Sequence, residues 1–160
     1  MSPSIYYFAY GSNMDLDRFR DRVGDWISVQ RASLPKHQLR FASMVQSEGG
    51  GGAVVDPSKG GQVYGVLFEI TQAQIEAMDR EEFDPTRDVE TTGKRVQMSV
   101  ETDAGPLTAQ LYTVDDDGGF LAPSESYLRH ILRGLTAAGY RETAHSAVRA
   151  AAEEAARNSV

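Results

Sequence analysis

The sequence predicts an α+β domain whose strands form a mostly antiparallel or mixed sheet. Apolar runs of strand length are interrupted by single helical segments and followed by a helical tail, an order typical of α+β domains. The connections between the strands are mostly of hairpin length, which is too short for the crossovers that parallel neighbours require. The chain has 160 residues and a hydrophobic fraction of 41%. These values suit one domain over residues 1–160 with a real core.

The predicted strands are apolar or alternating runs bounded by turn residues. The first covers residues 5–9 and is followed by a short charged helix over residues 15–22. Later strands are expected at residues 26–32, 38–43, 53–55, 63–70, 96–100 and 107–113. Turns are expected at Pro35, at residues 56–61 and at residues 103–105, where Pro, Gly and Asp interrupt the apolar pattern.

Three further helices follow from capping signals and periodicity. Residues 71–74 read Thr-Gln-Ala-Gln, a capping box that predicts a helix ending near residues 80–81. Pro123 and Ser124 open a helix whose apolar residues keep an i, i+3, i+4 rhythm through Leu135. An Ala-rich helix at about residues 142–157 has high helix propensity. It carries few large apolar side chains, so we expect its end to fray.

Composition excludes several classes of function. The formal net charge is −7, from 23 acidic and 16 basic residues, and no basic run is present, so we expect no nucleic acid partner. The absence of cysteine excludes disulfides, thiolate metal sites and a cysteine nucleophile. The three histidines lack metal-ligand spacing, so we expect no metal. The sequence has no nucleotide-binding fingerprint either, and we expect no cofactor. Without a basic start or a long apolar run, we expect no signal peptide and no membrane span, and a cytoplasmic protein.

The segment Tyr10-Gly11-Ser12-Asn13 is the first candidate site. A strand that ends in Gly, Ser and Asn can turn its backbone N–H groups to one side and form a nest for an anion or oxyanion. Gly11 is expected to supply an unusual φ and to let a substrate approach the backbone. The alternative is a plain turn in which Ser12 or Asn13 caps the next helix. Ser12 as a nucleophile is a weaker idea, because no histidine is placed to activate it.

An acidic helix end is the second candidate site. Residues 78–83 read Met-Asp-Arg-Glu-Glu-Phe, and the apolar residues at both ends suggest that part of the run is buried. A carboxylate against apolar walls has a raised pKa and can exchange protons near neutral pH. The alternative is a solvated helix terminus. The glycines of residues 49–52 are neither a phosphate loop nor a dinucleotide fingerprint, and suggest either a mobile hairpin tip or backbone close to a ligand.

The order of these segments resembles that of the γ-glutamylcyclotransferase-like family. The resemblance covers about residues 5–140. It lies in the opening residues 8–14 (Phe-Ala-Tyr-Gly-Ser-Asn-Met), the Gly-rich residues 50–55, the strand of residues 63–67, the Met-Asp-x-x-Glu pattern ending at Glu82, and the Pro-Ser-x-x-Tyr start ending at Tyr127. Two departures are Phe83, where the family often has glycine, and a loop over residues 84–94 that is longer than usual.

The resemblance implies a small mixed β-barrel flanked by helices, and an enzyme. Its substrate would be a small-molecule γ-glutamyl amide, cyclised to 5-oxoproline with release of an amine or amino acid. Tyr10, Gly11, Ser12 and Asn13 would hold the γ-glutamyl group through backbone amides. Glu82 would be the catalytic acid and base, or Glu81 if the alignment slips by one residue. Gly51 and Tyr127 would also line the substrate pocket.

Two other classes of function stay open from the sequence. One is a non-catalytic module of the same fold that binds a carboxylate or small anion in the nest. The other is an interaction domain that uses the Ala-rich C-terminal helix. The group attached to the γ-glutamyl unit and the oligomeric state are not readable from the sequence.

Overall fold

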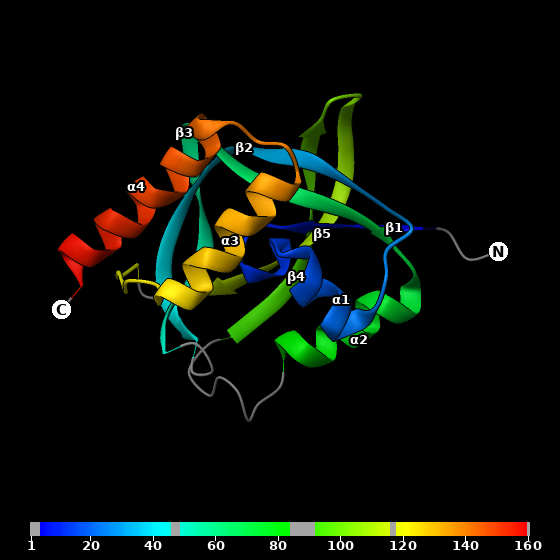
Figure 1. The fold of residues 1–160 in the computed structure, drawn as a ribbon, viewed down its shortest axis with the longest axis horizontal. Coiled ribbons are helices and arrows are strands. Elements are labelled where there is room, and N and C mark those ends of the chain that lie inside the picture. The colour runs from blue at the N-terminus through cyan, green and yellow to red at the C-terminus, as the bar shows by residue number, and fades with distance from the viewer. Residues whose placement is uncertain (1–3, 46–48, 84–91, 116–117, 160) are drawn as a thin grey trace.

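A closed five-stranded barrel forms the centre of the molecule (Figure 1). The computed structural model describes residues 4–45, 49–83, 92–115 and 118–159. The strands are β1 (Ile5–Ala9), β2 (Ser28–Val45), β3 (Gly50–Ile70), β4 (Thr92–Thr102) and β5 (Gly105–Asp115), in the barrel order β1-β3-β2-β4-β5. Neighbours pair antiparallel except β1 and β5, which run parallel. The α+β class and the small mixed barrel are therefore confirmed.

Helices flank this barrel, as Figure 1 shows. They are the short η1 (Ser12–Met14), α1 (Leu16–Val23), α2 (Gln72–Glu82), α3 (Glu125–Ala137) and α4 (Glu142–Asn158). The capping box of α2 is present in both directions between Thr71 and Gln74, and Ser124 caps α3 by accepting from the Tyr127 amide. No helix in the described part of the chain is long and apolar enough to cross a membrane.

Two of the predicted breaks lie inside long strands. The expected turns at Pro35 and at residues 56–61 belong to β2 and β3, which pair on both sides of them. Pro35 pairs with Gln62 and His37 pairs with Pro57, so four residues of β3 stand opposite Lys36 alone. Lys36 has φ 61°. The turn residues do interrupt the regular pairing, but they form a bulge within the paired strands and do not end them.

The expectation that the C-terminal helix frays is wrong. Ala144, Val148 and Ala155 of α4 are buried, and the Ser159 hydroxyl just beyond the helix accepts from the Ala122 amide at 3.1 Å. Small side chains allow the helix axis to approach its neighbours closely. A helix with few large apolar residues is therefore still held along its whole length.

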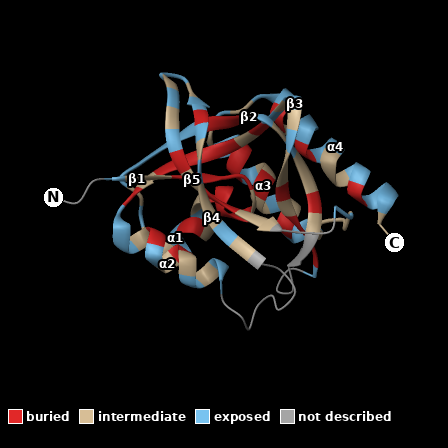
Figure 2. Cartoon of the chain, turned by 180° about the vertical axis from the view of Figure 1, so that it is seen from behind, coloured by how far each residue is buried: buried red, intermediate tan, exposed pale blue. Residues whose placement is uncertain are grey.

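Strand alternation divides the core into two clusters. One contains only strand residues and Tyr10, including Phe8, Leu67 and Leu111, and fills the barrel. The other joins the outer barrel wall to the helices, where Phe19 of α1 stacks on Phe68 of β3 with ring centroids 4.0 Å apart. Figure 2 shows buried residues along the strands and on the inner sides of the helices. Successive residues of one strand thus serve different cores.

Candidate active site

The turn after β1 is fixed by a buried carboxylate. Asp15, only 4% exposed, caps α1 by accepting from the Asp17 amide at 3.1 Å. The cap of α1 is therefore Asp15, and not Ser12 or Asn13 as the alternative interpretation of this turn expected. The Asp15 Oδ2 atom lies 2.8 Å from His130 Nδ1 and 3.3 Å from Arg133 Nη1, both on α3. This carboxylate ties the turn to two helices at once.

Gly11 is required for space and not for its φ angle. Its φ is −111°, which other residues also adopt, so the expectation of an unusual φ is wrong. A Cβ at this position would lie 2.7 Å from the Tyr127 hydroxyl oxygen. That hydroxyl accepts a hydrogen bond from the Ala53 amide of β3 at 3.1 Å. The turn, β3 and α3 therefore meet at the Tyr127 hydroxyl, and burial raises the pKa of Tyr127.

The Asn13 side chain connects the turn to the end of α2. It is 5% exposed, and its Nδ2 donates to Glu82 Oε1 at 3.1 Å. The same nitrogen lies 3.0 Å from the Tyr7 hydroxyl and 3.5 Å from the Met78 sulfur. Its Oδ1 is buried with no hydrogen-bond partner in the described residues, which is a rare condition in native proteins. Residues 13 and 82 thus meet although 69 positions separate them.

The Glu82 carboxyl has a raised pKa. Burial is the first cause, while Arg22, the Asn13 donor and Arg18 lower the pKa and Glu81 raises it further. Glu82 is also the last residue of α2, where the partial negative charge of a helix end disfavours an anion. The side chain still keeps 30% of its surface accessible. A carboxyl with a raised pKa and an accessible surface is suited to exchange protons with a ligand.

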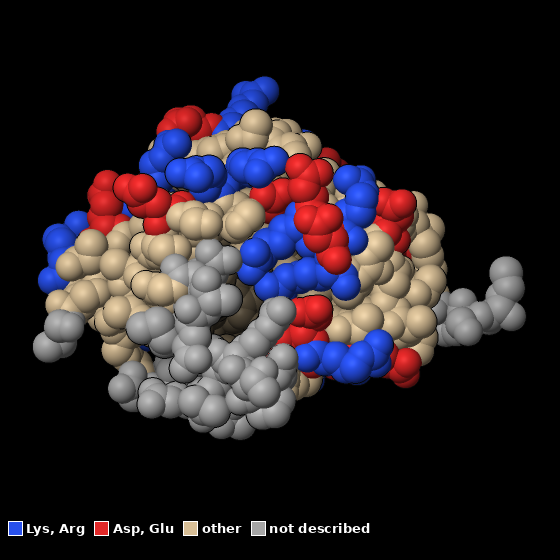
Figure 3. All heavy atoms as spheres, turned by 60° about the horizontal axis from the view of Figure 1, so that its bottom comes forward, with Lys and Arg blue, Asp and Glu red and all other residues tan. Residues whose placement is uncertain are grey.

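The surface is hollowed on the side where α2 lies. Figure 3 brings this side forward and shows a hollow with Lys and Arg side chains along one border. The cations that approach the Glu82 carboxyl are Arg22, with Nη1 at 3.9 Å, and Arg18, whose Nε donates to the Ser12 hydroxyl at 3.1 Å. The Glu82 carboxyl thus has a raised pKa and two arginines near it.

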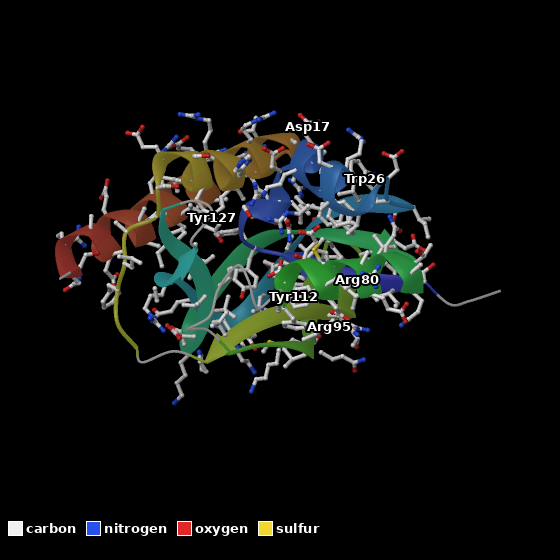
Figure 4. The ribbon with its side chains drawn as sticks, turned by 90° about the horizontal axis from the view of Figure 1, so that it is seen from below. Asp17, Trp26, Arg80, Arg95, Tyr112 and Tyr127 are labelled. Atoms are coloured by element: carbon white, nitrogen blue, oxygen red, sulfur yellow. The ribbon has the colours of Figure 1, made fainter. Side chains whose placement is uncertain are left out.

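Asp79 holds α2 against the barrel one helical turn before Glu82. Its Oδ1 accepts from the Tyr112 hydroxyl at 2.7 Å, and its Oδ2 accepts from Arg95 Nη2 at 3.0 Å. Figure 4 shows Tyr112 and Arg95 beside α2. The Phe83 ring packs edge-on against Tyr112, with centroids 5.5 Å apart. Phe83 has φ −107°, so this position needs no glycine, and the aromatic ring instead adds a second contact between α2 and β5.

Comparison with known proteins assigns the family. A family model described as gamma-glutamyl cyclotransferase, AIG2-like, matches residues 7–129, and this range contains the turn, Glu82 and Tyr127. The chain belongs to this family. A comparison with curated protein sequences gives no match.

Solved structures share the fold of this cyclotransferase-like chain. A structure named gamma-glutamyl cyclotransferase is 24% identical, with a TM-score of 0.76 over 92% of this chain and 88% of its own. An uncharacterized human protein, loc79017, is also 24% identical, with a TM-score of 0.76 over 92% of this chain and 87% of its own. YkqA from Bacillus subtilis is 25% identical with a TM-score of 0.74, over 94% of this chain but 55% of its own length.

Tyr10 and Gly51, which were expected to bind the substrate, also make packing contacts within the fold. The Tyr10 side chain lies in the barrel cluster, and its hydroxyl donates to the Tyr112 carbonyl at 2.5 Å, so only its backbone is left for the turn. Gly51 faces the segment before α3: its amide donates to the Ala122 carbonyl at 2.8 Å, and a Cβ would lie 1.9 Å from the Leu121 carbonyl oxygen. Glycine is needed there for close packing of backbone on backbone.

Several residues around the site were not predicted to have a role there, among them Tyr7, Arg22 and Asp79. Tyr7 and Arg22 contact the Asn13–Glu82 pair, and Asp79 anchors its helix. Strand alternation was a usable signal for Tyr7, because it places Tyr7 on the face opposite to Phe8. The described residues contain no group of three His, Asp or Glu side chains that could hold a metal ion.

Proposed function

We propose that this chain is a γ-glutamylcyclotransferase that converts a γ-glutamyl amide into 5-oxoproline and a free amine or amino acid. The contact between Asn13 and Glu82 carries the proposal. It brings a carboxyl with a raised pKa to the turn that would hold the substrate. The family supports the reaction class, and Arg22 and Arg18 near the Glu82 carboxyl suit a substrate that bears a carboxylate.

The proposed reaction is an intramolecular acyl transfer. The substrate's α-ammonium gives a proton to the Glu82 carboxylate, and the freed amine attacks the γ-carbonyl carbon. A C–N bond forms and closes a five-membered ring with a tetrahedral oxyanion. Glu82 then gives a proton to the leaving nitrogen as the old amide bond breaks. The α-ammonium loses two protons in becoming the lactam N–H, and the leaving nitrogen takes up two in becoming an ammonium ion, so protons balance.

Three features would accelerate the proposed cyclisation. A positioned acid and base contributes about 10²–10⁴-fold. The backbone of residues 10–13 is proposed to donate to the oxyanion, at roughly 3 kcal/mol per donor. Folding of the glutamyl chain against Gly11 and Tyr127 would favour the ring-closing conformer. Asn13 is a positioning residue here, because it holds the Glu82 carboxylate from one side.

A substrate panel tests the proposal. Purified protein is incubated with γ-glutamyl amino acids, γ-glutamyl amines and glutathione, and 5-oxoproline is measured. We expect release from at least one class, loss by orders of magnitude in Glu82→Gln, and near-normal release in the matched neighbour Glu81→Gln. Loss in Glu81→Gln alone would move the assignment by one residue. Binding of 5-oxoproline with no release from any member of the panel would support the non-catalytic binding module instead.

A further inference from the structure

Arg22 is a largely buried cation beside the proposed acid and base. Its side chain is 17% exposed, and its Nη1 lies 3.9 Å from Glu82 Oε1. This distance is too long for a hydrogen bond, so the ion pair is loose. Arginine presents five donors in a planar fork that matches a carboxylate. Among the described residues, Arg22 has only this loose ion pair, so its donors can bind a second, better placed carboxylate.

The charge around the hollow suggests what that partner is. The chain carries a net charge of −7, and Figure 3 shows Lys and Arg side chains beside the hollow with Asp and Glu side chains next to them. The two arginines near the Glu82 carboxyl are Arg22 and Arg18, and such cations attract an anionic ligand. Arg22 and Arg18 both belong to α1, which follows the turn directly.

We propose that Arg22 binds the α-carboxylate of the γ-glutamyl unit and so selects substrates that carry it. This inference rests on the proposed function, in which the α-amine meets Glu82. In an amino acid the carboxylate oxygens lie only about 3 Å from the amine nitrogen, since one carbon atom separates the two groups. A substrate whose amine contacts Glu82 can therefore bring its carboxylate within reach of Arg22, whose Nη1 lies 3.9 Å from Glu82 Oε1.

The change of charge during turnover favours the same assignment. When Glu82 accepts the proton of the α-amine, its negative charge is lost, and Arg22 then lacks its nearby counter-charge. Leaving a mostly buried cation without a partner is costly. A bound α-carboxylate supplies that partner for as long as the substrate stays in place. The loose 3.9 Å pair is thus exchanged for a closer one when the substrate binds.

Binding of a matched ligand pair tests this role apart from catalysis. Calorimetry compares 5-oxoproline with 2-pyrrolidinone, which is the same ring without the carboxylate. For Arg22→Gln we expect about tenfold to a hundredfold weaker binding of 5-oxoproline, the range of one charge-assisted interaction. Binding of 2-pyrrolidinone should not change, and Arg22→Lys should retain part of the affinity. The control Arg20→Gln, on the same helix but paired with Asp25 at 2.6 Å, should bind as the wild type does.

Turnover distinguishes recognition of the α-carboxylate from recognition of a carboxylate on the leaving group. With γ-glutamyl-propylamide, whose leaving group has no carboxylate, Arg22→Gln should raise KM much more than it lowers kcat. A loss confined to substrates whose leaving group carries a carboxylate would overturn the proposal. Equal weakening of 5-oxoproline and 2-pyrrolidinone would overturn it too, since it would indicate general damage to the site. If binding depends on Arg22 as expected but no 5-oxoproline is ever released, the carboxylate site stands and the proposed enzyme activity fails.

Discussion

Replacing Gly11 by alanine tests the geometry of the turn most sharply. The new Cβ would lie 2.7 Å from the Tyr127 hydroxyl oxygen and 3.7 Å from the Ala53 Cβ. The hydroxyl must therefore retreat by about 0.7 Å to reach ordinary van der Waals contact. It already accepts from the Ala53 amide at 3.1 Å, so a retreat lengthens or breaks that hydrogen bond.

The free-energy costs of the steric overlap and of the weakened hydrogen bond can both be estimated. Overpacking at a well-filled position costs about 1–3 kcal/mol, and a lost hydrogen bond costs about 1 kcal/mol. Gly11→Ala should therefore lower the free energy of unfolding by about 2–4 kcal/mol. Removing the hydroxyl with Tyr127→Phe makes room for the methyl group. The double variant should then be more stable than the sum of the single effects predicts, by about 1–2 kcal/mol.

Urea unfolding of the four proteins measures this coupling, with the midpoint compared at constant m-value. The control is Gly60→Ala on β3, where a Cβ meets no heavy atom within 4 Å, and it should stay within about 0.5 kcal/mol of the wild type. A Gly11→Ala variant as stable as the wild type, or strictly additive effects in the double variant, would refute the proximity of Gly11 and Tyr127.

Three further changes are predicted to have distinct effects. Because burial raises the pKa of Glu82 above 4.5, the folded wild type loses stability as pH rises from 4.5 to that raised pKa. Glu82→Gln lacks this loss, so thermal melts from about pH 4 to 8 should show a stability advantage of the variant that grows with pH. A stability difference that stays constant with pH would count against the raised pKa. Asn13→Ala removes a donor that lowers the same pKa, so the acidic limb of kcat/KM should move to higher pH, whereas a shift to lower pH would reverse the assigned role. Asp79→Asn weakens the contact between α2 and Arg95 and should reduce kcat while costing about 1–2 kcal/mol of stability; unchanged kcat would show that Asp79 does not position Glu82.

Local signals in the sequence predicted the helices well. The capping box at residues 71–74 and the Ser124 cap depend on side chains within three positions of the amides they bind. Strand breaks were harder to predict. Pro35 and residues 56–61 carry strong turn chemistry, but pairing between β2 and β3 continues past them. Long-range pairing decides such cases, and one sequence does not reveal it.

The candidate site was predictable only in part for the same reason. Glu82 and the turn of residues 10–13 stand out as segments, and their order suggested that they belong together. The Asn13 contact with Glu82 spans 69 positions, and Arg22 reaches the same carboxyl from another helix. No spacing rule connects residues on separate elements. Gly51 was predicted to contact a ligand because glycine lets a ligand approach the backbone. Glycine also allows close packing of backbone on backbone, and that is its role at this position.

The most direct measurement is the amount of 5-oxoproline formed by wild-type protein and by Glu82→Gln from the γ-glutamyl amide that the wild type turns over best, with calorimetric binding of 5-oxoproline measured in both. If Glu82 is the acid and base, the wild type releases 5-oxoproline and amine in equal amounts, and the variant binds 5-oxoproline but forms almost none. Turnover by Glu82→Gln within about tenfold of the wild type would contradict the central role of this carboxyl.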